Sequence, residues 1–211
     1  MRLYDYAASG NCYKVRLLLA LLDQPYERVP IDIFAGDTLT DQYTAINPLR
    51  ETPVLELDSG HRIAQSNAIL WYLSESTTFL PDTALARAQI AQWLFFEQES
   101  VMSGIGSARF RMLTGRDASG LPGRLEIASK ALHVLEAHLA EREFVVGADP
   151  TAADISIFAY THVAPDAGID LGRFPAVSAW LARIESLPRF IDDFVPYPDN
   201  ARPAQGRSIY D

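Results

Sequence analysis

The sequence predicts a two-part protein, in which a mixed α/β domain is followed by an all-helical bundle. Residues 15–22 place apolar side chains at i, i+3, i+4 and i+7, which is one face of a helix flanked by strand-like segments. Beyond about residue 85 the apolar periodicity is helical throughout. With 211 residues, 48% of them hydrophobic, the chain is long enough for two small domains with buried cores.

The first part contains strands and helices in a definite order. Residues 2–6 and 29–33 read as strands on either side of the first helix, which makes a βαβ unit. A weak helix at 38–46 follows, and then come strands at 53–57 and 61–64 joined by a turn at 58–60, and a helix at 66–75. This order, βαβ followed by ββα, is the thioredoxin-like arrangement.

The second part carries apolar stripes at helical spacing. They cover residues 90–112, 125–139, 155–159 and 177–184, and antiparallel helices with short connections form a bundle. We therefore predict a thioredoxin-like domain at 1–76, a linker at 77–84, a helical domain at 85–195 and a tail at 196–211. The tail contains three prolines and few apolar residues, so the sequence allows it to be disordered or to lie across the surface.

Composition narrows the possible roles of the chain. A net charge of -9 repels phosphate backbones and anionic lipid, which disfavours nucleic-acid and membrane-surface functions. The N-terminus has no apolar segment typical of a signal peptide, and no stretch has transmembrane length, so we expect a cytoplasmic protein. A single cysteine excludes an internal disulfide, and four scattered histidines predict no metal site.

Four short patterns follow one another along the chain. The first two are Ser9-Gly10-Asn11-Cys12 and Asn47-Pro48 with Thr52-Pro53-Val54-Leu55. The others are Gln65-Ser66 before Ala68-Ile69, and Thr151 with Asp154 at the spacing of a helix capping box. In this order they resemble the glutathione S-transferase family over essentially the whole chain up to the tail. The resemblance is to bacterial members with a serine-type motif.

The resemblance implies roles for Ser9 and Asn11 at the glutathione sulfur. A thiol has an unperturbed pKa of about 8.5, and the thiolate is the nucleophile. A hydroxyl donor at the N-terminus of a helix stabilises an anion placed there. Ser9 would act as this donor, whereas the local sequence alone favours a simple helix cap.

The resemblance also implies the groups that hold the rest of glutathione, with no metal. Pro53 would be a cis-proline, and Thr52 would present its backbone to the cysteinyl part, so that the tripeptide pairs like an added strand. Gln65 and Ser66 would hold the γ-glutamyl end at a helix N-terminus. Arg50 and Glu51 stand where the family often has glycine and a basic or amide residue. Of these two, Arg50 is the candidate contact for the glycyl carboxylate.

The implied reaction has two forms. A glutathione thiolate attacks an electrophilic substrate, as in detoxification, or it attacks sulfur in a disulfide exchange. The resemblance leaves both forms open, since some bacterial Nu-type members, which use glutathione in disulfide reduction, have Thr or Ser and then Asn at the positions of Ser9 and Asn11. Asn11 also differs from the Cys of beta-class members, and Ser9-Gly10-Asn11 differs from the Ser-Ser-Cys of zeta-class isomerases. A non-catalytic glutathione-binding or interaction module is the third interpretation.

The pocket for the second, small hydrophobic or electrophilic substrate is predicted from Cys12, Met102, Ile105 and Arg109. Cys12 is either a redox thiol or a small packed hydrophobe. Gly104 and Gly106 lie in a segment of small residues that either leaves room for substrate or lets helices pack closely. The resemblance further implies a homodimer.

Overall fold

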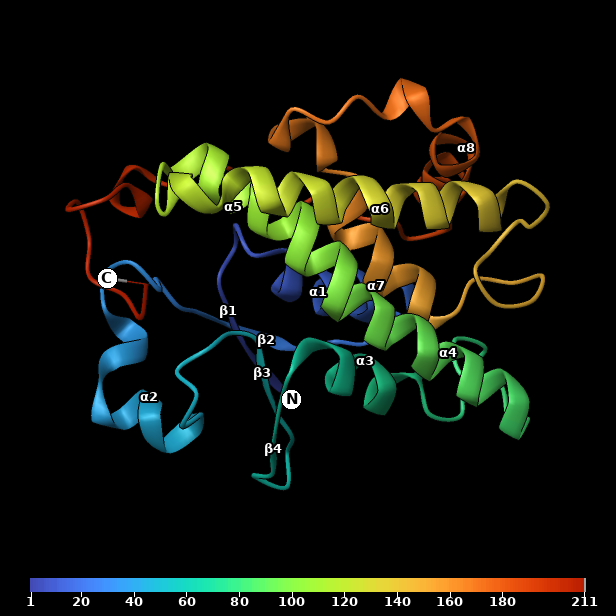
Figure 1. Cartoon of the computed structure of the whole chain (residues 1–211). Helices are drawn as coiled ribbons and strands as arrows, with labels where there is room; N and C mark the ends of the chain where they lie inside the picture. Colours follow the sequence, from blue (N-terminus) through green and yellow to red (C-terminus); the bar gives the residue numbers. More distant parts are fainter. Residues whose placement is uncertain (211) are drawn as a thin grey trace. The chain divides into compact units, whose positions relative to one another are not determined.

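The computed structural model describes residues 1–210, and they form two compact units (Figure 1). The sheet unit comprises Met1–Leu73 together with the C-terminal segment that starts at Ile191, and the helical unit is Ser74–Phe190. The segment 77–84, expected as a linker, thus belongs to the helical unit. The tail, whose course the sequence left open, belongs to the sheet unit.

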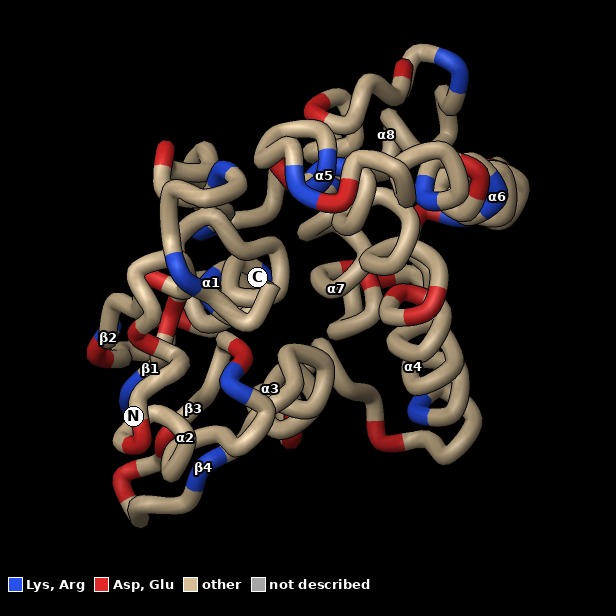
Figure 2. Tube along the Cα trace, turned by 60° about the vertical axis from the view of Figure 1, so that its left-hand side comes forward, with Lys and Arg blue, Asp and Glu red and all other residues tan. Residues whose placement is uncertain are grey.

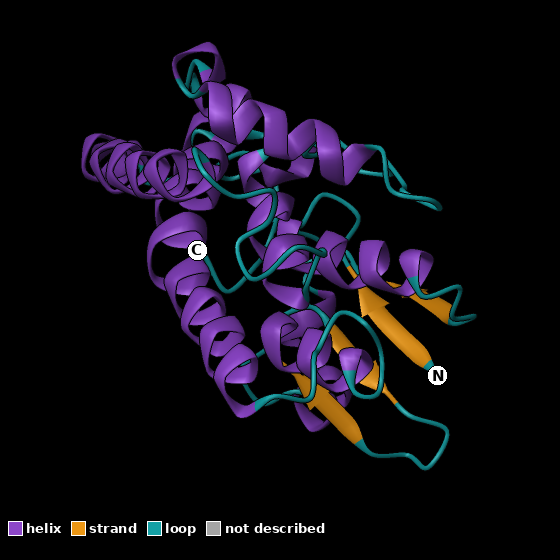
Figure 3. Ribbon diagram, turned by 90° about the vertical axis from the view of Figure 1, so that its right-hand side faces the viewer, coloured by secondary structure: helices purple, strands orange, loops and turns teal. Residues whose placement is uncertain are grey.

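The sheet unit contains a four-stranded mixed sheet in the order β2-β1-β3-β4 (Figure 3). The strands are β1 (Arg2–Asp5), β2 (Glu27–Pro30), β3 (Val54–Glu56) and β4 (Arg62–Ala64). β1 pairs in parallel with β2 and antiparallel with β3, and β3 pairs antiparallel with β4. The second strand ends at Pro30, three residues before the end predicted for it, because the chain then turns at 32–37 through contacts to Asp32.

Helices cover both faces of this sheet. Its helices are α1 (Gly10–Leu21), α2 (Asp41–Ile46) and α3 (Ser66–Ser74). Side chains alternate between the two faces along a strand. One face therefore packs on α1 and α3 through Leu3, Val15, Leu19, Leu55 and Ile69. The opposite face packs on α2 through Tyr4, Tyr43 and Val54. This arrangement confirms the predicted thioredoxin-like order.

Among the described residues, the helical unit contains five α-helices and one π-helical segment, besides three short 3-10 helices (Figure 1). They are α4 (Ala84–Phe96), the π-helical η2 (Glu97–Gly106), α5 (Ser107–Thr114), α6 (Leu121–Leu139), α7 (Ala152–Thr161) and α8 (Pro175–Glu185).

The capping box at the start of α7 is confirmed, since the Asp154 carboxylate accepts hydrogen bonds from the backbone N–H and the hydroxyl of Thr151. Asp154 also accepts a hydrogen bond from Trp180 Nε1 in α8, so the cap joins two helices.

The small residues of η2 serve close helix packing. A Cβ added to Gly104 would lie 2.6 Å from the backbone nitrogen of Ala128 in α6, and one added to Gly106 would lie 2.7 Å from the Tyr160 ring of α7. Neither distance leaves room for a methyl group. At both glycines, therefore, the packing interpretation holds.

Charged residues of both signs are interspersed along both units, as Figure 2 shows for the Cα trace. In the part of the chain that the structure describes, no three His, Cys, Asp or Glu side chains are grouped so that they could hold a metal ion. Over residues 1–210, no helix is both long enough and apolar enough to cross a membrane.

Candidate functional site

Ser9 begins the first helix at the end of β1. Its backbone is extended, with φ -86° and ψ 125°, and its Oγ accepts a hydrogen bond from the Cys12 backbone N–H at 3.3 Å. The predicted cap is therefore present. A hydroxyl that accepts one hydrogen bond keeps its own O–H, so the capping Ser9 has one donor, which either the Cys12 sulfur or an anion at the helix N-terminus can take.

A buried cluster connects the beginnings of α1 and α3. The fully buried Lys14 donates from Nζ to Asn11 Oδ1 at 3.0 Å and to Ser66 Oγ at 3.4 Å. Ser66 Oγ in turn donates to Asn11 Oδ1 at 3.1 Å. An ammonium group is only a donor, so the atom of the Asn11 side chain that faces Lys14 must be the oxygen. The amide NH₂ of Asn11 therefore points away from Lys14 and Ser66.

Sequence reasoning selected Asn11 and Ser66 but missed Lys14. The feature that could have indicated a role for Lys14 is its position. It lies one helical turn after Asn11 and directly before Val15, in a helix whose residues 12–19 are all buried. A cation in such a run needs polar partners, because an unpaired buried charge is strongly destabilising. Lys14 Nζ thus lies within hydrogen-bonding distance of Ser66 Oγ, where the γ-glutamyl carboxylate was predicted to bind.

The loop before β3 is held by Asn47. The buried Asn47 side chain donates from Nδ2 to the Glu51 carbonyl at 2.9 Å and accepts from the Leu49 backbone N–H at 3.1 Å. Tyr43 Oη donates to the same Glu51 carbonyl at 2.9 Å. The peptide bond between Thr52 and Pro53 is cis, which confirms the predicted cis-proline. These contacts fix the position of Thr52 at the start of β3.

Arg50, Glu51 and Gln65 were also predicted to bind glutathione. They lie in or next to this loop, but their side chains make different contacts. Gln65 has a positive φ of 71°, an uncommon backbone conformation for a non-glycine residue, and its Nε2 donates to the Glu51 carboxylate at 3.3 Å. Glu51 and Gln65 are thus brought together. Arg50 also has a positive φ, 57°, and its Nε donates to Thr44 Oγ1 of α2 at 3.1 Å.

Cys12 is buried, and the pKa of its thiol is raised. Its side chain has no exposed surface, and burial, together with the negative charge of Asp5, raises the pKa of its thiol to about 12. Hydrogen bonds from Thr52, the Tyr6 backbone and Ser9 act in the opposite direction but are outweighed. A thiol with this pKa stays protonated near neutrality, which favours packing over a redox role.

The other three residues predicted for the second-substrate pocket belong to the helical unit. Ile105 is fully buried, and Arg109 is almost fully buried, with its Nε 2.8 Å from the Asp166 carboxylate. Met102 is half-buried. The Arg109 guanidinium thus has a carboxylate partner within its own unit. A substrate anion would have to compete with that carboxylate.

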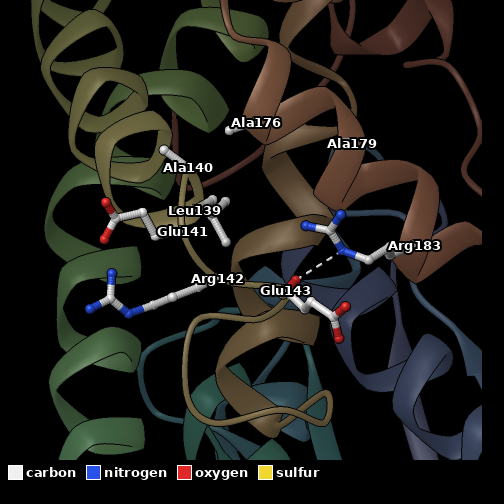
Figure 4. Close-up of a pocket in the computed structure, with 8 residues that line it drawn as sticks. All are labelled: Leu139, Ala140, Glu141, Arg142, Glu143, Ala176, Ala179 and Arg183. Carbon is white, nitrogen blue, oxygen red and sulfur yellow. Dashed lines mark hydrogen bonds between the residues drawn. The ribbon is translucent and has the colours of Figure 1, made fainter.

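A hollow of about 330 Å³ lies at the C-terminal end of α6 beside α8 (Figure 4). Its wall includes Arg183, whose Nε donates to the Glu143 carbonyl at 3.0 Å. None of the predicted site residues lines this hollow. The candidate site is the part of the sheet unit where hydrogen bonds link Asn11 to Ser66 and Cys12 to Ser9 and Thr52.

Comparison with known families identifies both parts of the chain. Residues 8–76 match the model of the glutathione S-transferase N-terminal domain, and residues 87–188 match that of the C-terminal domain. The first match contains all the candidate residues of the sheet unit. The chain therefore belongs to the glutathione S-transferase family.

Similar proteins differ in their stated activities. A crystal structure of a possible glutathione S-transferase from Rhodopseudomonas palustris is 46% identical, with a TM-score of 0.87, and the match covers 91% of this chain and 89% of that one. The disulfide-bond oxidoreductase YfcG of Escherichia coli is 27% identical over 87% of this chain and 89% of its own. A maleylacetoacetate isomerase of Rhizobium meliloti is 29% identical over 95% and 97%. Family membership alone therefore does not specify which reaction this protein catalyses.

The state of Cys12 yields a first prediction. Since its pKa is raised to about 12, roughly three orders of magnitude less thiolate is present at neutral pH than for a thiol of pKa about 8.5. We expect a disulfide reagent to modify native protein at least a hundredfold more slowly than the same protein in urea. Rapid stoichiometric labelling of the native protein would contradict the buried, protonated state.

Proposed function

We propose that this protein is a glutathione S-transferase that binds glutathione on the sheet unit and holds its thiol as a thiolate. In the reaction the sulfur forms a bond to an electrophilic carbon. The thiol proton goes to solvent, and the leaving group departs with its electron pair. The observation that carries the proposal is the buried Lys14 cluster, which ties the beginnings of two helices together and sets the direction of the Asn11 amide.

Two groups would stabilise the thiolate. The Ser9 hydroxyl lies at the N-terminus of α1, where the helix dipole favours negative charge. The Asn11 NH₂ points away from its buried partners and is a second donor. A hydrogen bond to a charged group contributes about 1.5–3 kcal/mol, so these donors suffice to lower a thiol pKa by one or two units.

The peptide part of glutathione would bind along the same surface. Its γ-glutamyl carboxylate would meet the N-terminus of α3 and the positive charge of Lys14, with Gln65 beside the amino group. Thr52 would pair its backbone with the cysteinyl residue. Because the Ser66 hydroxyl donates to Asn11, its backbone N–H is the better candidate for the carboxylate.

Disulfide reduction is the main alternative. The similarity to the Escherichia coli oxidoreductase and the Ser9-Gly10-Asn11 sequence support it. Maleylacetoacetate isomerisation is less favoured, because the Ser-Ser-Cys run of zeta-class isomerases is absent from residues 9–11. A non-catalytic module would bind glutathione without turnover. We further propose a cytoplasmic homodimer, for which sedimentation at micromolar concentration is the test.

Calorimetric titration with reduced and with oxidised glutathione tests the proposal. We expect the reduced form to bind more tightly, because one thiol has to reach the donors at Ser9 and Asn11. Preference for the oxidised form would favour disulfide exchange. Binding of neither form would exclude both enzymatic interpretations.

Ser9→Ala tests the role of the hydroxyl. The substitution removes one charge-assisted hydrogen bond, worth about 1.5–3 kcal/mol, so we expect the pKa of the bound thiol to rise by about one to two units. The rate with a fixed electrophile should fall roughly tenfold to a hundredfold near pH 7 and recover as the pH rises through the shifted pKa. Glutathione affinity should change little. An unchanged pH–rate profile would show that Ser9 is only a helix cap.

A further inference from the structure

Glu51 is an exposed carboxylate on an anchored piece of backbone. Its carbonyl accepts hydrogen bonds from Tyr43 Oη and Asn47 Nδ2, both at 2.9 Å. Tyr43 and Asn47 are buried, whereas the residue they hold is exposed. The Glu51 carboxylate is therefore accessible to a ligand, while the backbone that carries it is fixed by two buried donors.

Gln65 is the hydrogen-bond partner of this carboxylate. It lies between β4 and α3 with a φ of 71°, and its carbonyl accepts a hydrogen bond from the Ile69 N–H at 3.0 Å. Gln65 Nε2 donates to the Glu51 carboxylate at 3.3 Å. A carboxylate only accepts hydrogen bonds, so the Gln65 atom that faces Glu51 must be the amide nitrogen. The Oε1 atom of Gln65 is therefore turned away from Glu51.

The negative charge of Glu51 has no ion-pair partner among the residues that the structure describes. The cation next to it in sequence, Arg50, donates from Nε to Thr44 Oγ1 at 3.1 Å instead. Gln65 contacts only one of the two Glu51 carboxylate oxygens. Glu51 and Gln65 thus offer two acceptor oxygens and a negative charge. An ammonium group, with three N–H donors and a positive charge, is the complement of this pair.

The pair lies next to the position proposed for the γ-glutamyl carboxylate. Ser66 follows Gln65 in sequence and begins α3, and its Oγ lies 3.4 Å from Lys14 Nζ. In the γ-glutamyl group the α-carboxylate and the ammonium are bonded to the same carbon, so a carboxylate at Ser66 places the ammonium beside a neighbouring residue. Positive charge from Lys14 and the helix dipole would face the carboxylate, and the negative charge of Glu51 would face the ammonium.

We propose that Glu51 is a specificity-determining residue, which binds the ammonium of the γ-glutamyl group together with Gln65 and so selects thiol peptides whose amino group is free and charged. The inference rests on the proposed function, because it requires the γ-glutamyl carboxylate to bind at Ser66. Glu51 acts in two ways. Its charge attracts the ammonium, and the hydrogen bond that it accepts from Gln65 leaves Gln65 Oε1 as an acceptor for the ligand.

A des-amino analogue separates this claim from the proposed function. The compound 4-carboxybutanoyl-cysteinylglycine keeps the thiol and both carboxylates of glutathione and lacks only the ammonium. In calorimetric titrations at about pH 6.5, where an α-amino group is protonated, we expect wild-type protein to bind reduced glutathione about a hundredfold more tightly than the analogue. In Glu51→Gln the affinity for glutathione should fall about tenfold. Affinity for the analogue should not fall, because it has no ammonium to lose, and this retained affinity also shows that the variant is folded.

Glu27→Gln is the matched control. It removes the same charge from an exposed carboxylate on β2, at the opposite edge of the sheet from β4, and should keep the wild-type discrimination between the two ligands. The inference is overturned if wild-type protein binds both ligands equally, if Glu51→Gln keeps the wild-type discrimination or weakens both ligands equally, or if Glu27→Gln loses as much discrimination as Glu51→Gln. Failure of wild-type protein to bind reduced glutathione at all would instead overturn the proposed function.

Discussion

Much of the candidate site depends on the burial of one positive charge. Lys14 has no exposed surface, and its ammonium is stable there only because polar partners surround it. Asn11 and Ser66 are among those partners, and they lie at the beginnings of α1 and α3. The hydrogen bonds that Lys14 Nζ donates to Asn11 and Ser66 thus fix the relative positions of two helix N-termini. Both termini favour negative charge, so in the proposed site a requirement of the core would also place two anion-binding positions on the sheet unit.

The surroundings of Cys12 and those proposed for the glutathione thiol have opposite effects on the pKa of a thiol. Cys12 is enclosed by protein and senses the negative charge of Asp5, which makes its thiolate costly and raises its pKa. A glutathione thiol at Ser9 would instead meet a half-buried hydroxyl at the beginning of the helix and an amide turned outward by Lys14. Burial and the nearby Asp5 carboxylate outweigh the hydrogen-bond donors at Cys12 and suppress its thiolate, while donors near the surface would stabilise the thiolate of glutathione. By this contrast a single loop would hold an inert cysteine beside the proposed thiolate site.

Local rules predicted much of this fold from the sequence. The order of strands and helices and the Thr151–Asp154 cap follow from short patterns, whereas the cis bond before Pro53 was expected from the family resemblance. The role of Lys14 could not be predicted, because it depends on Ser66, fifty-two residues away in sequence. The path of the C-terminal segment that starts at Ile191 was equally inaccessible, since Asp193, predicted as part of the helical domain, pairs with Arg16 across 177 positions. The partner of Arg109 is likewise distant, so the sequence suggested a substrate contact where the structure has an ion pair.

The most direct test of this account is a pH titration of the thiolate absorbance of glutathione bound to wild-type protein and to Lys14→Met. If Lys14 orients Asn11, the thiol bound to wild-type protein titrates at least about one unit below its free value of about 8.5. Loss of the ammonium frees the Asn11 amide to turn, and the bound thiol of the variant then titrates about one unit closer to the free value. Equal pKa values for glutathione bound to the two proteins would contradict the central role of the buried lysine.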